Sequence, residues 1–387
     1  MVNRLRRCLL LAAALAPAAV RARDEIDYPP VTPRALQFPR DFGAHAPFRI
    51  EWWYLTGVLD AAPQMRQSRL GIQLTFFRIR PPIDPGNPSR FAAHQVVMAH
   101  AAIADPTRGS LLHEERIERT GFGIASMSEL DTDVRVDGWS LARDAASGIY
   151  HGRARGERFE LDVLATPAQP PLLQGNSGYS RKGPKPLDNG EGPAPASFYY
   201  SQPQLALQAK LWIAQDGDAA RTEDRGAGNS ALREGLGWLD HEWSSALLPP
   251  QAAGWDWAGF NLDDGSALTV FRIRRSGAAA ADPPYFAYAS LRTPGGPTQT
   301  FAPAQIAFAQ RELWTSPRTR AIYPVAQRIQ IGSRRFETRP LMQDQELDSR
   351  ATTGFAYWEG ASDLLENGRT IGRGYLELTG YAGAVPG

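Results

Sequence analysis

The sequence predicts an all-β protein built from two antiparallel β-barrels or half-barrels packed together. Three observations predict this fold class. Aromatic residues make up 10% of the 387 residues, and aromatic side chains favour strands. The chain has 36 glycines and 31 prolines, which is typical of many short elements joined by turns. Apolar and polar residues alternate with a period of two, and no long segment shows helical periodicity.

The predicted strands follow one another along most of the chain. In the first half, alternation predicts strands over 51–59, 70–77, 95–103, 111–119, 134–141 and 159–163. In the second half, it predicts strands over 255–262, 268–273, 285–291, 336–339, 357–361 and 375–381. The turn Asp263-Asp264-Gly265 makes the first two of these a hairpin. Residues 303–313 are the best candidate for a few helical turns.

Two polar stretches interrupt this pattern. Residues 165–196 are rich in proline and glycine, and residues 214–233 are polar and rich in glycine. We place a domain boundary in the second stretch, which predicts an N-terminal domain over 36–234 and a C-terminal domain over 235–387. Each domain is long enough to form one closed barrel.

The N-terminal residues 1–22 have the pattern of a secretory signal peptide. Three arginines precede an apolar run from Cys8 to Val20, and small residues follow at the expected cleavage position. The run is too short to span a bilayer as a helix. We therefore expect export to the periplasm or the medium, by the Sec route rather than the Tat route. No other segment is apolar enough to cross a membrane.

Charge and cysteine content exclude several function classes. Lys and Arg number 42 against 41 Asp and Glu, a net charge of +1. Removal of the four arginines in residues 1–22 changes this charge to −3, so we expect no nucleic-acid partner. The only cysteine, Cys8, leaves with the same segment. The mature chain therefore has no disulfide and no thiol chemistry.

Aromatic and ionisable residues gather in four clusters. The first joins His45 to Glu51-Trp52-Trp53-Tyr54, where Glu51 alone is better read as a strand-start residue than as a functional acid. The second contains His100, and a single histidine on an apolar strand is typical of a hydrogen-bonded core residue. The third lies around Tyr179, in an insertion that forms either a binding loop or surface decoration.

The fourth cluster is the densest and favours function. It comprises Gly237-Trp238-Leu239-Asp240-His241-Glu242-Trp243 and Gly254-Trp255-Asp256-Trp257. Strand alternation places Asp240 and Glu242 on one face and His241 and Trp243 on the other. Such strands could also seal the end of a barrel, but charges among tryptophans are costly to bury without a purpose. The histidines lack the spacing of zinc motifs, and no metal site is predicted.

These clusters resemble the AttH-like and carotenoid 1,2-hydratase group. The matching segments run in order along nearly the whole mature chain: Glu51-Trp52-Trp53-Tyr54-Leu55-Thr56-Gly57, Gln73-Leu74-Thr75-Phe76-Phe77-Arg78, Met98-Ala99-His100, Gly178-Tyr179-Ser180-Arg181-Lys182-Gly183, Tyr199-Tyr200-Ser201, Trp238-Leu239-Asp240-His241-Glu242-Trp243, Gly254-Trp255-Asp256-Trp257 and Tyr357-Trp358-Glu359-Gly360-Ala361. The resemblance implies two lipocalin-like, calycin-type barrels or half-barrels with a binding cavity near their junction.

The resemblance also suggests the activity. The group includes hydratases that add water to an isolated double bond of carotenoids, and exported proteins encoded beside ABC transporters. The export signal favours the exported, AttH-like branch. We therefore expect a hydrophobic isoprenoid or lipid-like ligand and a hydratase or hydrolase-like reaction. The alternative is a non-catalytic carrier that works with an ABC transporter.

Acid catalysis in an aromatic pocket would need no metal or organic cofactor. Burial keeps a carboxyl group protonated, and tryptophan faces stabilise a carbocation by about 0.5–2 kcal/mol each. The expected catalytic residues are His241, Trp243, Asp240 and, as the candidate acid, Asp256. The expected ligand-binding residues are Glu51, Trp53, Tyr54, His100, Tyr179, Trp255 and Trp257. An enzyme should direct an acid of perturbed pKa at the ligand, whereas a carrier needs only apolar walls.

Overall fold

The computed structural model describes residues 27–61, 68–184, 195–214, 231–245, 248–279 and 282–385. The predicted signal peptide over 1–22 lies outside these residues. Among the described residues the structure is all-β, as predicted, with two short 3₁₀ turns, η1 (Arg40–Phe42) and η3 (Pro303–Gln305). None of the described helices is long and apolar enough to cross a membrane.

The first sheet has thirteen antiparallel strands in the order β4-β3-β2-β1-β13-β12-β9-β8-β7-β6-β5, with β10 and β11 paired to β12. Its strands are β1 (Ile50–Leu59), β2 (Leu70–Ile79), β3 (Val96–Ala104), β4 (Leu112–Arg119), β5 (Ala125–Met127), β6 (Asp133–Val136), β7 (Trp139–Arg143), β8 (Tyr150–Arg155), β9 (Phe159–Pro167), β10 (Leu172–Leu173), β11 (Tyr179–Arg181), β12 (Ala196–Ile213) and β13 (Ala231–Ser244).

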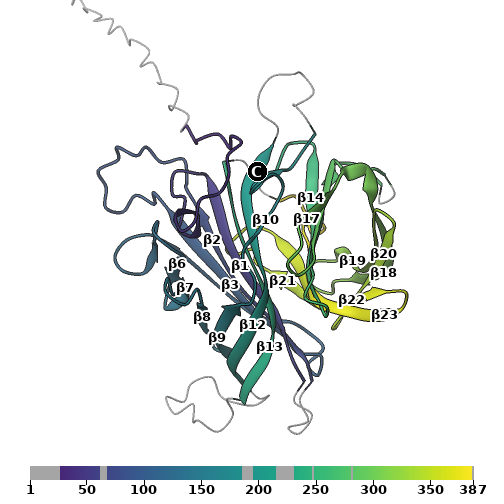
Figure 1. Ribbon diagram of the computed structural model, residues 1–387. Coiled ribbons are helices and arrows are strands. Elements are labelled where there is room, and N and C mark those ends of the chain that lie inside the picture. The colour runs from purple at the N-terminus through teal and green to yellow at the C-terminus, as the bar shows by residue number, and fades with distance from the viewer. Residues whose placement is uncertain are drawn as a thin grey trace, which may run out of the picture.

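The second sheet has ten antiparallel strands in the order β17-β16-β15-β14-β23-β22-β20-β19-β18, with β21 paired to β22. Its strands are β14 (Ala252–Leu262), β15 (Ala267–Arg275), β16 (Phe286–Arg292), β17 (Thr298–Phe301), β18 (Ile306–Thr315), β19 (Ile322–Ile331), β20 (Arg334–Pro340), β21 (Glu346–Asp348), β22 (Ala356–Glu366) and β23 (Arg369–Leu378). Together the sheets form one nearly closed barrel and one half-barrel, side by side, as in a two-domain lipocalin-like protein (Figure 1).

Two sequence-based expectations need correction. Residues 303–313 form no helix beyond the single turn η3, because β18 pairs with β19 from Ile306 onward and its backbone hydrogen bonds go to that neighbour. The polar stretch over 214–233 also does not mark the change of sheet. β13 pairs with β1 as far as Ser244, so the chain enters the second sheet after that residue and not near 235.

The three largest apolar clusters among the described residues are the cores that hold this arrangement together. One core lies inside the barrel that the first sheet forms and includes Leu55, Phe76 and Trp139. A second lies inside the half-barrel of the other sheet, around Phe260 and Trp358. The third lies between the sheets and is the most aromatic of the three. Its buried members are Tyr54, Val58, Leu172, Trp238, Trp257, Ala267, Phe271, Ile273, Tyr285, Ala361 and Tyr375. We call the region around this third core the junction.

Candidate functional site

The central strand pair β1–β13 sends its side chains alternately to two different places. The register pairs Tyr54 with Asp240 and Trp53 with His241. Side chains alternate along each strand, so one set points into the first barrel and the other points toward the second sheet. The barrel-facing set is Glu51, Trp53, His241 and Trp243, and the junction-facing set is Trp52, Tyr54, Asp240 and Glu242. The predicted separation of Asp240 and Glu242 from His241 and Trp243 is present.

The barrel-facing set is centred on the buried carboxylate of Glu51. Its Oε1 lies 2.9 Å from Nδ1 of His45 and 2.8 Å from Nε2 of His241, and Nε of Arg78 donates to Oε2 at 3.1 Å. Burial alone would raise the pKa of Glu51. The hydrogen bonds from His241 and His45 and the charge of Arg78 outweigh burial and hold this pKa well below its usual range. Glu51 is therefore ionised and is a poor proton donor.

Two tryptophans clamp the histidines of this network. The ring of His45 stacks on Trp243 with centroids 3.6 Å apart, and His241 stacks on Trp53 at 4.8 Å. On its other side, Nε2 of His45 lies 3.1 Å from Asp41. A cavity of about 280 Å³ lined by Asp41 and His45 opens next to the network. The predicted residues Glu51, Trp53, His241 and Trp243 thus meet in one structural unit.

Among the described residues, His45, Glu51 and His241 form the group that comes nearest to a metal site. The ligand atoms of His45, Glu51 and His241 lie within 4.8 Å of one another. The carboxylate of Glu51, however, already accepts hydrogen bonds from both histidines, from Arg78 and from the backbone N–H of His45. A buried guanidinium on the carboxylate opposes a second cation there. The residues therefore fit a hydrogen-bonded ion network better than a metal site.

The junction-facing set is chemically different because its carboxyl groups have no arginine. Asp240 accepts hydrogen bonds from Tyr199 Oη at 2.8 Å, from Ser201 Oγ at 2.6 Å and from Trp238 Nε1 at 2.7 Å. Burial raises the pKa of Asp240 to about 7, although these three hydrogen bonds lower it. Asp240 is therefore an acid poised near neutral pH.

Two further acids reach the junction from the second sheet. Glu359 and Glu377 stand directly opposite each other on β22 and β23. Burial and the charge of Glu377 raise the pKa of Glu359 well above its usual range. Burial raises the pKa of Glu377 to about 7, and Trp255 Nε1 donates to its Oε2 at 3.1 Å. These three acids thus gather in an apolar region, and no cation among the described residues forms an ion pair with any of them.

Glu359 is the best placed of these acids to donate a proton. The hydroxyl of Tyr54 donates to its Oε1. Its Oε2 is buried and has no hydrogen-bond partner among the described residues. A carboxyl group that is protonated and has one unpaired oxygen carries an available O–H. The side chain of Glu359 is 1% exposed, so bulk water does not compete for this proton.

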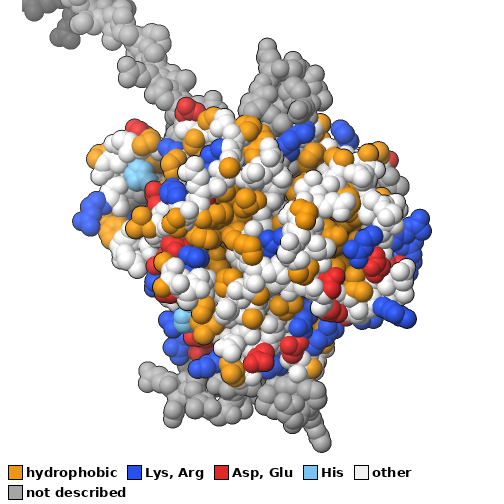
Figure 2. Space-filling view, viewed as in Figure 1, with side chains coloured by type: hydrophobic (Ala, Val, Ile, Leu, Met, Phe, Trp, Pro, Cys, Tyr) orange, Lys and Arg blue, Asp and Glu red, His pale blue; other side chains and the backbone are white. Residues whose placement is uncertain are grey.

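Aromatic rings enclose the junction acids. Trp257 Nε1 donates to the hydroxyl of Tyr199 at 2.9 Å, and its ring meets Tyr54 edge-on at 5.4 Å. The outer rim consists of half-buried apolar residues, which are Trp52, Leu248, Ala252, Trp255, Phe286, Tyr288 and Leu341. Figure 2 shows a band of hydrophobic side chains between the two halves of the molecule. The junction therefore combines apolar walls with protonated carboxyl groups.

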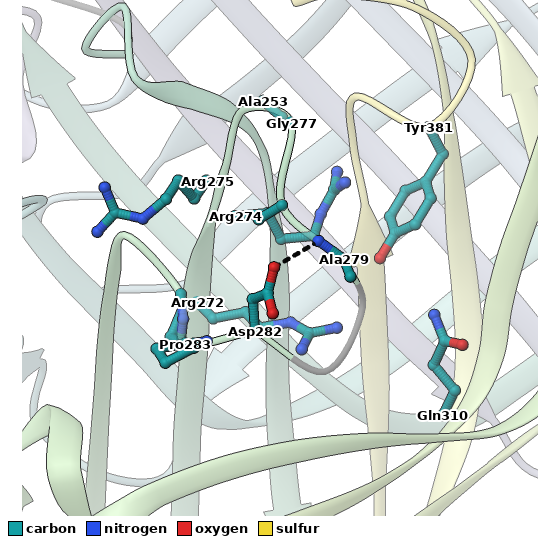
Figure 3. Close-up of a pocket in the computed structure, with 12 residues that line it drawn as sticks. Ala253, Arg272, Arg274, Arg275, Gly277, Ala279, Asp282, Pro283, Gln310 and Tyr381 are labelled. Carbon is teal, nitrogen blue, oxygen red and sulfur yellow. Dashed lines mark hydrogen bonds between the residues drawn. The ribbon is translucent and has the colours of Figure 1, made fainter.

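Asp256, the predicted acid, lies on the other side of β14. Alternation points it away from Trp255 and Trp257 and into the second barrel. Its carboxylate pairs with Arg272 at 2.7 Å and Arg274 at 3.1 Å. The two arginines line a cavity of about 220 Å³ on this side of the strand (Figure 3). A carboxylate paired with two guanidinium groups has a structural role, and we therefore place Asp256 outside the candidate site.

His100 and Tyr179 also lie apart from the junction acids. His100 is buried and lies 2.9 Å from both Tyr357 Oη and Thr352 Oγ1. Burial lowers its pKa to about 3, so it is a neutral, hydrogen-bonded core histidine. Tyr179 packs against Phe198 in a separate apolar cluster. From the same insertion, Lys182 is the residue that reaches the junction, where its Nζ lies 2.7 Å from Glu242.

Sequence reasoning did not select Glu359, Glu377 or Tyr199 as site residues. Glu359 lies within the segment Tyr357-Trp358-Glu359-Gly360-Ala361, whose pattern indicates the family but no role for its carboxyl group. Glu377 lies in the apolar strand β23 between the buried residues Leu376 and Leu378. A carboxylate within a strand of largely buried residues was the available signal for both acids.

The fold and the site together define a two-domain, lipocalin-like protein with a buried acid and aromatic junction. The AttH-like family model matches residues 29–381, and the chain belongs to the AttH-like family. The comparison with curated proteins finds no match.

Two solved structures show the same architecture. A protein from Nitrosomonas europaea, named as a candidate AttH, is 44% identical, with a TM-score of 0.79 over 91% of this chain and 99% of that chain. Kievitone hydratase from Nectria haematococca is 12% identical, with a TM-score of 0.62 over 89% of this chain and 92% of that chain. At this identity the second likeness shows the fold alone.

Proposed function

We propose that this protein binds a hydrophobic, isoprenoid or lipid-like molecule at the junction and adds water to one of its double bonds by acid catalysis. The observation that carries the proposal is Glu359, a buried carboxyl group with a raised pKa and an unpaired Oε2. Hydration of an unactivated double bond needs a strong acid that does not lose its proton to bulk water. An apolar enclosure keeps bulk water away from such an acid.

The proposed reaction begins with proton transfer from Glu359 Oε2 to one carbon of the double bond. The π electron pair forms the new C–H bond and leaves a cation on the other carbon. A water oxygen adds to that cation, and the proton it releases returns to the carboxyl pair of Glu359 and Glu377. The atoms of alkene and water are thus conserved in the alcohol, and the acid is regenerated.

The surrounding residues support both charged stages of this reaction. Tyr54 donates to Oε1 of Glu359, so it stabilises the carboxylate that forms after proton transfer. The rings of Trp257 and Trp238, whose centroids are 6.3 Å apart, present π faces to a cation in the junction. Glu377 stands opposite Glu359 and has a pKa of about 7, so it can take up the proton that water releases and share it with Glu359.

The test uses farnesol, which has an isolated double bond at its hydrocarbon end, as the probe in ¹⁸O-labelled water. Mass spectrometry of the labelled alcohol measures the rate. We expect Glu359→Gln to lower the rate by roughly 10²–10⁴-fold, the usual contribution of a general acid. The matched control is Glu337→Gln, since Glu337 is a half-buried glutamate on β20 of the same sheet that pairs with Arg328 near the surface. Equal rates for Glu359→Gln and the wild type would remove Glu359 from the mechanism.

A non-catalytic carrier that works with an ABC transporter is the second candidate function. The observation that favours it is that each predicted catalytic group is already engaged: His241 is hydrogen-bonded to Glu51, Asp256 is paired with Arg272, and Asp240 accepts three hydrogen bonds. Native mass spectrometry of protein purified from its own host separates the two functions. A co-purified lipid or isoprenoid that the protein leaves unhydrated supports the carrier.

We also propose that the protein is exported. The support is the basic and apolar pattern of residues 1–22. Mass spectrometry of the protein recovered from the periplasm or the medium tests this. Export predicts a chain that starts close after residue 22.

A further inference from the structure

Two exposed phenylalanines lie side by side at one end of the first barrel. Phe91 belongs to the connection between β2 and β3, and Phe122 belongs to the turn between β4 and β5. Phe91 is 72% exposed and Phe122 is 52% exposed, and their rings stack with centroids 5.6 Å apart. Aromatic surface that stays exposed to water is unfavourable. Packing of the core does not explain why these two rings are exposed.

The backbone around Phe122 is built to hold its ring outward. Gly121, Phe122 and Gly123 have φ angles of 106°, 55° and 76°. A phenylalanine in this left-handed region is unusual and costs free energy. A Cβ added at either glycine would meet nothing within 4 Å, so the glycines are there for their backbone conformation and not for space. Strain of this kind persists where the exposed side chain has a use.

Two arginines cover these rings and have no acidic partner among the described residues. The guanidinium of Arg119 lies 4.7 Å from the ring of Phe122 and 5.3 Å from that of Phe91, and Arg90 lies 5.5 Å from Phe122. Neither arginine forms an ion pair with a described residue, and the one hydrogen bond of Arg119 goes to the backbone oxygen of Arg90. We call Phe91, Phe122, Arg90 and Arg119 the aromatic–arginine patch.

We propose that the aromatic–arginine patch docks the protein on the surface of a membrane that contains anionic phospholipids. Aromatic rings partition to the level of the lipid headgroups, and each basic residue near an anionic surface adds attraction. The exposed apolar side chains of Ile117 and Ile124, each 45% exposed, lie on the neighbouring strand and turn and extend the apolar area. The proposal is independent of the reaction at the junction.

Charge complementarity favours an anionic membrane over a second copy of the chain or another protein as the partner of this patch. A second copy of the chain would bring its own unpaired arginines to the same place, and the like charges would repel each other. The two rings lie on two connections between strands and stack on each other with both rings largely exposed. A flat, anionic and deformable surface satisfies both the rings and the guanidinium groups.

The test is vesicle flotation with the full-length mature protein. We expect binding to mixed phosphatidylcholine–phosphatidylglycerol vesicles, weaker binding to pure phosphatidylcholine vesicles, and loss of binding as salt is added. Arg90→Gln/Arg119→Gln should weaken binding by roughly fivefold per arginine. Phe91→Ser/Phe122→Asn should weaken it by roughly tenfold or more. Asparagine tolerates the left-handed backbone of residue 122, so this variant keeps the turn.

The matched control is Leu313→Ser/Ile322→Ser, because these residues are 54% and 55% exposed on the second sheet. This variant should bind vesicles like the wild type, and circular dichroism should show all variants folded. Equal binding by the wild type and Phe91→Ser/Phe122→Asn would overturn the proposal. So would a wild-type dimer in light scattering that Phe91→Ser/Phe122→Asn abolishes, since a second copy would then cover the patch.

Discussion

The two faces of the strand pair β1–β13 differ in the way that they bury acids. Toward the first barrel, the carboxylate of Glu51 is matched by Arg78 and hydrogen-bonded to two histidines, and its pKa lies well below the usual range. Toward the second sheet, Asp240 meets only hydroxyl and indole groups, and its pKa rises to about 7. The same backbone therefore carries an ionised carboxylate, Glu51, on one face and a carboxyl group poised near neutral pH, Asp240, on the other.

This difference shows that burial by itself does not set the state of a carboxyl group. Burial raises the pKa in both places, and at Glu51 the hydrogen bonds from His241 and His45, together with the charge of Arg78, outweigh it. The ionised face gives the strand pair a rigid, directional network. The protonated face keeps acids available at neutral pH in an apolar region, which is the property that the proposed chemistry needs.

The largest expected effect follows from breaking the ionised face. Arg78→Met leaves the buried carboxylate of Glu51 without its cation, and removal of one partner from a buried pair costs about 3–5 kcal/mol. Urea denaturation measures the free energy of unfolding. Arg328→Met is the control, because Arg328 pairs with Glu337 at the surface and such pairs contribute about 0–1 kcal/mol. A loss at Arg78 no larger than that at Arg328 would contradict the role of the network.

A smaller effect is expected from Asp240→Asn and should depend on pH. Because the pKa of Asp240 is raised in the folded state, its contribution to stability is present below pH 3.8 and is lost as pH rises through about 7. At 1.36 kcal/mol for each pKa unit, the loss is at most about 4 kcal/mol. The free energy of unfolding of Asp240→Asn should therefore fall less steeply than that of the wild type from pH 4 to pH 8. This range spans the unfolded and folded pKa values of Asp240.

The opposite sign is expected for Glu51, whose pKa is lowered by folding. Its contribution to stability is present above the unfolded value of 4.5 and is lost as pH falls. Urea denaturation from pH 4 to pH 8 checks the sign for Asp240, and its extension below pH 4.5 checks the sign for Glu51. An unchanged slope in Asp240→Asn would show that this carboxyl group is already ionised at neutral pH.

The smallest effect is expected from Tyr54→Phe, which removes one hydrogen bond from Glu359. A net hydrogen bond contributes about 0.5–1.5 kcal/mol to stability. The double variant Tyr54→Phe/Glu359→Gln completes a cycle that isolates the interaction. Additive losses in unfolding free energy would mean that the two side chains do not interact across the junction.

The sequence predicted the all-β fold and the division of β13 into two faces, because both follow from the period of two along a strand. It did not predict the site acid. Tyr54 and Glu359 are 305 residues apart in the chain, and strand alternation gives no information about contacts between two sheets. Asp256 is a different case, because alternation along β14 already points it away from Trp255 and Trp257, whose closeness in sequence made it look like part of their cluster.

Composition, alternation and motif order were sufficient for the fold class and the family, because both depend on local patterns that each segment carries within itself. The protonation state of each buried acid depends on which charges and hydrogen-bond donors lie within a few ångströms. Strand pairing within each sheet placed Arg78 beside Glu51 and Arg272 beside Asp256. The packing of the two sheets placed Tyr54 beside Glu359. The tertiary structure therefore determined which of the many carboxyl groups could act as an acid.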